Sequence, residues 1–257
     1  MTWEAAQEAR KRLAREQGTI VKDWGGRIAV ALVYPNSYRV GMSNLGLQTL
    51  YKLFNSHRDI VCERVFWEGR PMPFKTSLLS LESQRPLTDF SVLAFTVSYE
   101  LDYFNIVQVL KASGIPPLAA GRTEEHPLII GGGPCLTANP EPLSLLFDAI
   151  AIGEGEPIAP GLLKVITEGV SGSREEQRLA LARVPGIYVP GESQSVARQW
   201  ADDIDDFATT SVALTPDTEL GDMYLMEIAR GCGRGCRFCL AGFAFRPFRT
   251  RSLPNLL

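Results

Sequence analysis

The chain has 257 residues, of which 45% are hydrophobic and 21% are charged, an ordinary composition for a globular protein. The formal net charge is -3, and no basic cluster favours nucleic acid or a membrane surface as a main partner. No apolar run is long enough to span a membrane, and the charged N-terminal residues are unlike a secretory signal peptide. These features predict a cytoplasmic protein.

Alternating strands and helices dominate the first two thirds of the chain. An amphipathic helix is predicted over residues 3–17, within an N-terminal unit of residues 1–20. Apolar runs then predict strands at 27–35, 60–67, 91–98, 127–133 and 148–156. Helical spacing of apolar residues predicts helices at 44–56, 72–83, 101–114 and 158–169. This order predicts an α/β domain over residues 21–170, a doubly wound, Rossmann-like parallel sheet that binds ligands where its strands end.

The remainder of the chain has a different pattern. Residues 171–222 are rich in turns and acidic residues, and they predict a linker with a loop at "SGSREEQ" and short extended pieces. Residues 223–231 predict one more strand, which runs directly into a glycine-rich loop. We therefore treat residues 223–257 as the beginning of a second domain.

Three of the five cysteines, Cys232, Cys236 and Cys239, lie within this loop. An odd number of cysteines in a chain with no export signal favours metal or redox chemistry over disulfides. Three thiolates can bind three corners of a cuboidal iron-sulfur cluster and leave one iron open for a substrate or cofactor. The alternative is a zinc site, whose fourth ligand would come from Cys62, Cys135, His57 or His126.

The loop resembles the signature of the radical S-adenosylmethionine (SAM) superfamily. The spacing is Cys-x3-Cys-x-aromatic-Cys, Phe238 fills the aromatic position, and "EIARG" resembles the usual lead-in. The resemblance implies a [4Fe-4S] cluster on the three cysteines, with SAM bound to the fourth iron. It also implies that one electron from the cluster cleaves SAM to methionine and a 5′-deoxyadenosyl radical. The cofactors supply the difficult chemistry, and the protein orients them.

The α/β domain resembles the cobalamin-binding domain that precedes the barrel in many of these enzymes. The matching stretches follow predicted strands: "GMSNLG" (41–46), "FTVS" (95–98), "IIGGGP" (129–134) and "IGEGE" (152–156). The resemblance implies a cofactor pocket formed by Ser43, Thr96, Ser98, Gly131, Gly132, Gly133, Gly153 and Glu154. The chain departs from the family pattern at Ser43, which replaces the histidine that binds cobalt, and serine is a poor cobalt ligand. Cobalamin without a protein ligand to cobalt and loss of cobalamin both stay open.

The resemblance also implies that the barrel is incomplete, because few residues follow Cys239. We expect a fragment of a longer enzyme that is inactive alone, with a second chain as one possible source of the remaining barrel. No catalytic residue and no substrate is assigned, since substrate contacts would come mostly from the remaining barrel. The competing hypothesis is a non-catalytic α/β binding module with a zinc or structural cysteine site.

Overall fold

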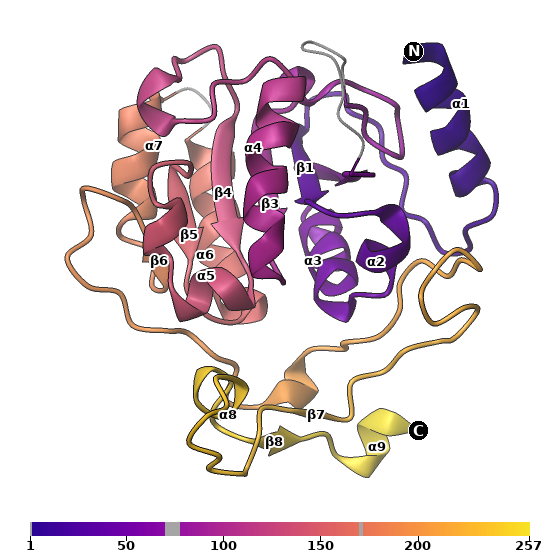
Figure 1. Cartoon of the computed structure of the whole chain (residues 1–257), viewed down its shortest axis with the longest axis vertical. Coiled ribbons are helices and arrows are strands. Elements are labelled where there is room, and N and C mark those ends of the chain that lie inside the picture. The colour runs from indigo at the N-terminus through magenta and orange to yellow at the C-terminus, as the bar shows by residue number, and fades with distance from the viewer. Residues whose placement is uncertain (1, 70–77, 170–171) are drawn as a thin grey trace.

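The computed structural model describes residues 2–69, 78–169 and 172–257. A twisted sheet with helices on both faces forms the body of the molecule, and the C-terminal segment lies below one edge of that sheet (Figure 1). The predicted doubly wound, Rossmann-like α/β fold is therefore confirmed. Within these ranges, no helix combines the length and the apolar character needed to cross a membrane.

The sheet has the strand order β2-β1-β3-β4-β5-β6. Its strands are β1 (Ile28–Tyr34), β2 (Ile60–Phe66), β3 (Val92–Thr96), β4 (Leu128–Gly132), β5 (Ala149–Ala151) and β6 (Ile187–Tyr188). The first five are parallel, and β6 adds antiparallel to β5. Because β2 and β3 flank β1 on opposite sides, the topological switch point lies between β1 and β3, and ligands are expected outside the carboxyl ends of these strands.

Both faces of the sheet are buried, which explains why the strands are nearly continuous apolar runs. In β1, Val30 and Leu32 pack into one core, while Ala31 and Val33 pack into the other. Helices α3 (Leu45–Ser56) and α6 (Gly155–Glu168) cover the first face. Helices α4 (Tyr103–Ala112) and α5 (Pro134–Ala138) cover the second.

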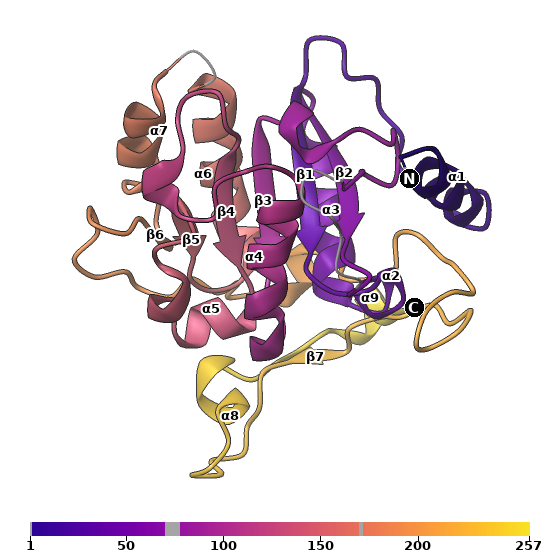
Figure 2. The same ribbon diagram turned by 45° about the horizontal axis from the view of Figure 1, so that its top comes forward.

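Short and peripheral helices complete this unit. Helix α1 (Thr2–Leu13) stands beside the β2 edge and packs Ala9 and Leu13 against the core under α3 (Figure 2). Helix α2 (Tyr38–Met42) follows β1. Single 3₁₀ turns occur at Leu87–Asp89, Glu100–Asp102, Ala119–Gly121, Glu141–Leu143 and Ile204–Asp206.

Two sequence predictions about local structure are wrong. The helix expected over 72–83 lies partly outside the described residues, and residues 78–83 are not helical, because Leu79 forms a β-bridge with Pro86 instead. The loop expected at "SGSREEQ" contains the start of helix α7 (Arg174–Leu181). Ser173 and Glu176 form a capping box that satisfies the free N–H groups of its first turn.

The C-terminal segment has little regular structure. Strand β7 (Ala229–Arg230) pairs antiparallel with β8 (Arg249–Thr250), and helices α8 (Ala241–Ala244) and α9 (Leu253–Leu256) are single turns. The predicted strand over 223–231 is therefore much shorter than expected. The physical reason is that, in the part of the chain described, β7 has no neighbour other than β8.

Candidate functional site

A cavity of about 380 Å³ opens at the carboxyl ends of the parallel strands. Its apolar walls come from the sheet, through Leu32 and Ile130, and from α3 and α6, through Phe54 and Leu162. Its mouth is lined by residues of the C-terminal segment, among them Arg230 and Phe245. The C-terminal segment lies below the sheet (Figure 1), and its residues help to line a cavity at the place where doubly wound folds bind ligands.

Most of the residues predicted for a cofactor pocket line this one cavity. They are Thr96, Ser98, Gly131, Gly132, Gly133, Gly153 and Glu154. Their strands run parallel, so the segments that follow them meet at the same edge of the sheet. The parallel sheet therefore brings residues that are more than 50 positions apart in the sequence into one wall of the cavity.

Ser43 is placed outside the cavity. Its hydroxyl donates to the carbonyl of Arg39 at 2.9 Å and accepts from the backbone N–H of Glu219 at 2.8 Å, so it closes the end of α2. The next residue, Asn44, does line the cavity and donates to the Ser98 hydroxyl at 3.2 Å. Asn44 also caps α3 by accepting from the N–H of Leu47. An asparagine before an apolar helical run was the available sequence signal for this position.

A close backbone approach fixes the turn that follows β5. Gly153 has φ +129, and a Cβ there would come within 2.1 Å of the Gln199 carbonyl oxygen. The two segments of this isolated bridge also exchange hydrogen bonds, from Glu154 N–H to Gln199 O at 2.9 Å and from Gln199 N–H to Ile152 O at 3.0 Å. Glycine is required here because another side chain would push residues 199–201 away from the sheet.

A cluster of charged side chains connects the turn at 153–156 to the C-terminal segment. Arg230 donates from Nη1 to Glu154 and from Nη2 to Glu156, both at 2.7 Å, and from Nε to Glu227 at 2.9 Å. Arg249 donates to both carboxylate oxygens of Glu154, at 2.6 and 3.0 Å. Burial works to raise the pKa of Glu154, but hydrogen bonds from Arg249, the Ala201 N–H and Arg230 lower that pKa below its ordinary value.

The cysteine loop begins just after this cluster. Cys236 is exposed, Cys232 and Cys239 are half-buried, and all three thiols are free. In the described residues, no three His, Cys, Asp or Glu side chains are gathered closely enough to hold a metal ion. Phe238, predicted as a cofactor contact, is 93% exposed and lies outside the cavity. The donors for a metal are therefore present on one accessible loop, which would have to close around an incoming ion.

Of the proposed fourth ligands for zinc, Cys62 and the two histidines are poorly placed to join the loop, whereas Cys135 lies on α5, which contacts α8 just beyond Cys239. Cys62 is fully buried in β2, and burial raises the pKa of its thiol well above the ordinary value. Cys135 packs in the core under α4, where burial first and then Glu100 and Asp102 raise its pKa to about 11. His57 caps the end of α3 just before β2, and His126 precedes β4, so both lie at the amino ends of the strands, away from the cavity.

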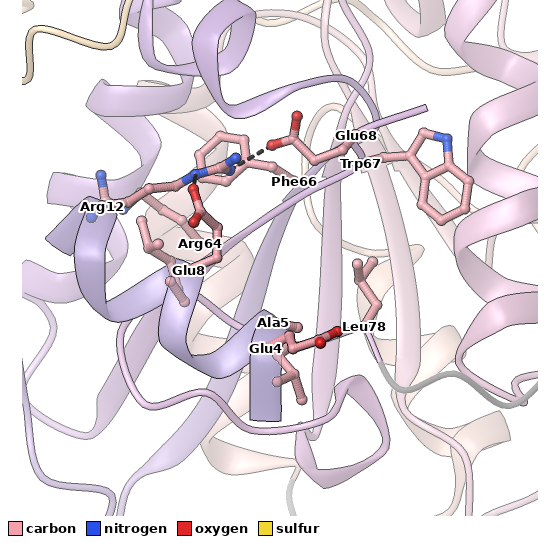
Figure 3. Close-up of a pocket in the computed structure, with 12 residues that line it drawn as sticks. Glu4, Ala5, Glu8, Arg12, Arg64, Phe66, Trp67, Glu68 and Leu78 are labelled. Carbon is pink, nitrogen blue, oxygen red and sulfur yellow. Dashed lines mark hydrogen bonds and ion pairs between the residues drawn. The ribbon is translucent and has the colours of Figure 1, made fainter. Parts of the chain in front are cut away.

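A second cavity, of about 640 Å³, lies between α1 and the β2 edge. Figure 3 shows its central charged groups, and they are paired with one another or with the core. Arg12 donates to Glu68 at 2.5 Å, while Arg64 donates to Glu82 at 2.7 Å and to Glu16 at 2.6 Å. The arginines of this cavity are thus engaged in ion pairs, and the cavity at the carboxyl ends of the strands, which contains the predicted pocket residues, is the better candidate.

The fold and the site together describe an α/β domain with a cavity at the carboxyl ends of its strands, joined to a three-cysteine loop. A protein-family model described as "Radical SAM proteins, N-terminal" matches residues 46–190, more than half of the chain, and the chain belongs to this family. The matched region runs from α3 to the residues just after β6. It thus covers most of the sheet and its helices and ends before the three cysteines.

A relative gives the chain a second point of comparison. An uncharacterized protein of Methanocaldococcus jannaschii is 29% identical over 233 residues, which cover 89% of this chain and 44% of the relative. The chain thus spans less than half of the length of this curated relative. No solved structure matches the chain.

Proposed function

We propose that this chain is the N-terminal part of a radical SAM enzyme in which Cys232, Cys236 and Cys239 hold a [4Fe-4S] cluster. The observation that carries the proposal is the position of the loop: Arg230, two residues before Cys232, lines the cavity of the family's α/β domain. Family membership supports the same chemistry. Because the relative is more than twice as long as the aligned region, we also propose that turnover requires further chain outside these 257 residues.

The chemistry of the donor set fits the cluster. Three free cysteines lie on a loop that carries Gly233 and Gly235, and the loop offers no fourth thiol. A cluster bound by three thiolates has one open iron, at which SAM would bind. When bound, this cluster supplies the electron that cleaves the sulfonium of SAM.

The chain's own residues would hold and shield these groups. The charged cluster around Arg230 fixes the start of the loop against the sheet. The apolar walls of the cavity, with Leu32, Phe54 and Ile130, would exclude water from whatever occupies it. A ligand in the cavity would also touch Ala244 and Phe245, which follow the cysteine loop closely.

Cobalamin is the cavity occupant that we propose. The apolar walls suit the benzimidazole base of the nucleotide tail of cobalamin, and the glycines at 131–133 would let that tail pass close to the backbone, with the corrin ring outside the cavity. No imidazole is available at the carboxyl ends of the strands for cobalt, because His57 and His126 lie at the amino ends. Bound cobalamin would supply methyl or alkyl transfer chemistry, and it would be held without a histidine ligand.

Anaerobic reconstitution of the chain with iron and sulfide tests the cluster. We expect about four irons per chain and a thiolate-to-iron charge-transfer absorption, both lost in Cys236→Ala. The matched control is Cys135→Ala, which removes a buried thiol on another element and should retain the iron.

Two other outcomes would contradict the proposal. A Cys236→Ala variant that keeps its iron would rule out the three-cysteine site. A colourless protein that binds one zinc through the same cysteines would support the competing hypothesis of a non-catalytic binding module. Incubation with cobalamin, followed by gel filtration and a visible spectrum, tests the cavity separately.

A further inference from the structure

We propose that Glu154 is a positioning residue for the cysteine loop, a role that rests on the proposed function because it concerns the assembly of a metal centre there. Glu154 belongs to the α/β domain and lies at the amino end of α6. It is separated from Cys232 by almost 80 positions in the sequence. Its carboxylate nevertheless accepts hydrogen bonds from Arg230 and Arg249, which stand at the beginning and at the end of the loop.

Those two arginines lie directly opposite each other. Arg230 of β7 pairs with Arg249 of β8 in the antiparallel register. Like charges at directly opposed positions repel each other and destabilise a strand pair. Glu154 contacts both guanidinium groups, at 2.7 Å and 2.6 Å, so one carboxylate neutralises the repulsion at the base of the loop.

The other carboxylates cannot replace Glu154 in this role. Glu156 reaches Arg230 alone, and Glu227 reaches Arg230 and Arg251. Arg249 has Glu154 as its only carboxylate partner among the residues described. The Glu154 side chain is only 8% exposed, so water cannot substitute freely for the two charged hydrogen bonds.

The pairing of β7 with β8 is short, and Glu154 is the carboxylate that ties both of its strands to the sheet. The pairing contains two residues from each strand, and the intervening residues 231–248 carry all three cysteines. Figure 2 shows this part of the chain projecting away from the sheet, below the domain. Removal of the Glu154 charge should therefore loosen the loop while the sheet stays folded.

The experiment compares the full chain with Glu154→Gln and with a control, Glu141→Gln. Glu141 is exposed near the same edge, and its carboxylate accepts from the Tyr188 hydroxyl. In metal-free protein, we expect amide hydrogen exchange in residues 226–231 and 247–252 to be about tenfold faster in Glu154→Gln, the effect of one lost charged hydrogen bond. Exchange in β1, β3 and β4 should stay unchanged, and the control should resemble the wild type.

A metal probe gives the second measurement. Cobalt(II) bound by thiolates has an intense charge-transfer absorption, and we expect Glu154→Gln to need about tenfold more cobalt for half-saturation. The double variant Glu154→Gln/Arg249→Gln removes one of the two opposed charges, and it should recover part of the exchange protection and part of the cobalt affinity. If Glu154→Gln acted only by disturbing the packing of the domain, the additional Arg249→Gln change would not restore exchange protection or cobalt affinity.

Each outcome decides the proposal. Unchanged exchange in Glu154→Gln overturns it, and so does faster exchange with wild-type cobalt affinity. If Glu154→Gln unfolds globally and the double variant does not restore it, the positioning role is also overturned. If the wild type itself binds no metal, the proposed function fails, and the exchange measurement alone decides whether Glu154 holds the base of the loop.

Discussion

Strand β1 pairs with β2 along seven residues, whereas β7 pairs with β8 along two. The first pair lies inside a sheet whose two faces are covered by apolar side chains. The second lies outside that core, next to exposed side chains such as Met223, Tyr224 and Ile228. Apolar burial positions the sheet, while ion pairs position the C-terminal segment.

The same contrast appears in two arginine clusters. Arg64, on β2, is 1% exposed and lies between Glu16 and Glu82, which are equally buried. Arg230, on β7, is 14% exposed, and its carboxylate partner Glu227 is 16% exposed. A buried charge that loses its partner destabilises what is packed around it: the Arg64 cluster lies in the core of the sheet, whereas the Arg230 cluster joins only the C-terminal segment to that sheet. The comparison predicts global effects for the first cluster and local effects for the second.

The largest effect is expected for Arg64→Met. This change leaves Glu16 and Glu82 buried without their cation, and it should lower the free energy of unfolding by about 3–5 kcal/mol. Urea denaturation followed by far-UV circular dichroism measures the loss. The control is Lys164→Met, because Lys164 and Glu168 form a pair that is 70% and 69% exposed, and it should cost less than about 1 kcal/mol. Equal losses in the two variants would contradict the contrast.

A smaller and local effect is expected for Gly231→Ala. Gly231 has φ +87, and a Cβ there would lie 2.4 Å from the Phe245 carbonyl oxygen and 2.6 Å from that of Pro247. The strain, about 1–3 kcal/mol, should separate β8 from β7 without unfolding the sheet. Hydrogen exchange of the Arg251 amide, which donates to Ile228 O at 3.0 Å, measures the separation.

Gly235→Ala is the matched control for that change, because a Cβ there meets no atom closer than 3.9 Å and no positive φ is involved. Its exchange should equal that of the wild type. If Gly231→Ala also lowers the urea midpoint of the sheet, the C-terminal segment is more strongly coupled to the core than the comparison implies.

The sequence predicts the sheet well, because its strands carry a local apolar pattern, and it predicts the contacts of the C-terminal segment poorly. The strands could be predicted because both faces of the sheet are buried, so that apolar runs such as 27–35 stand out. The cavity wall followed from the glycines and polar residues after those strands. Arg249 could not be identified as the partner of Glu154, because that contact joins positions 95 residues apart in a segment without apolar periodicity.

Helix α7 packs against the sheet domain, although its sequence is too polar to predict a packed helix. Most of its side chains are charged or polar, and yet Leu181 is completely buried in the core under α6. Arg174 at its first position donates to Asp148 at 2.7 Å and so fastens it to the start of β5. The signal that identifies this helix is the Ser-x-x-Glu capping box, which lies inside a polar stretch whose composition predicts a loop.

The smallest effect is therefore expected for Ser173→Ala, which removes the cap of α7. The Ser173 hydroxyl accepts from the N–H of Glu176 at 3.2 Å, and its loss should destabilise the sheet unit by about 1 kcal/mol. Ser173→Thr retains a hydroxyl that both accepts from the Glu176 N–H and donates to the Glu176 carboxylate, so its urea midpoint should match the wild type. A Ser173→Ala midpoint equal to the wild type would place α7 with the loosely held C-terminal segment rather than with the sheet.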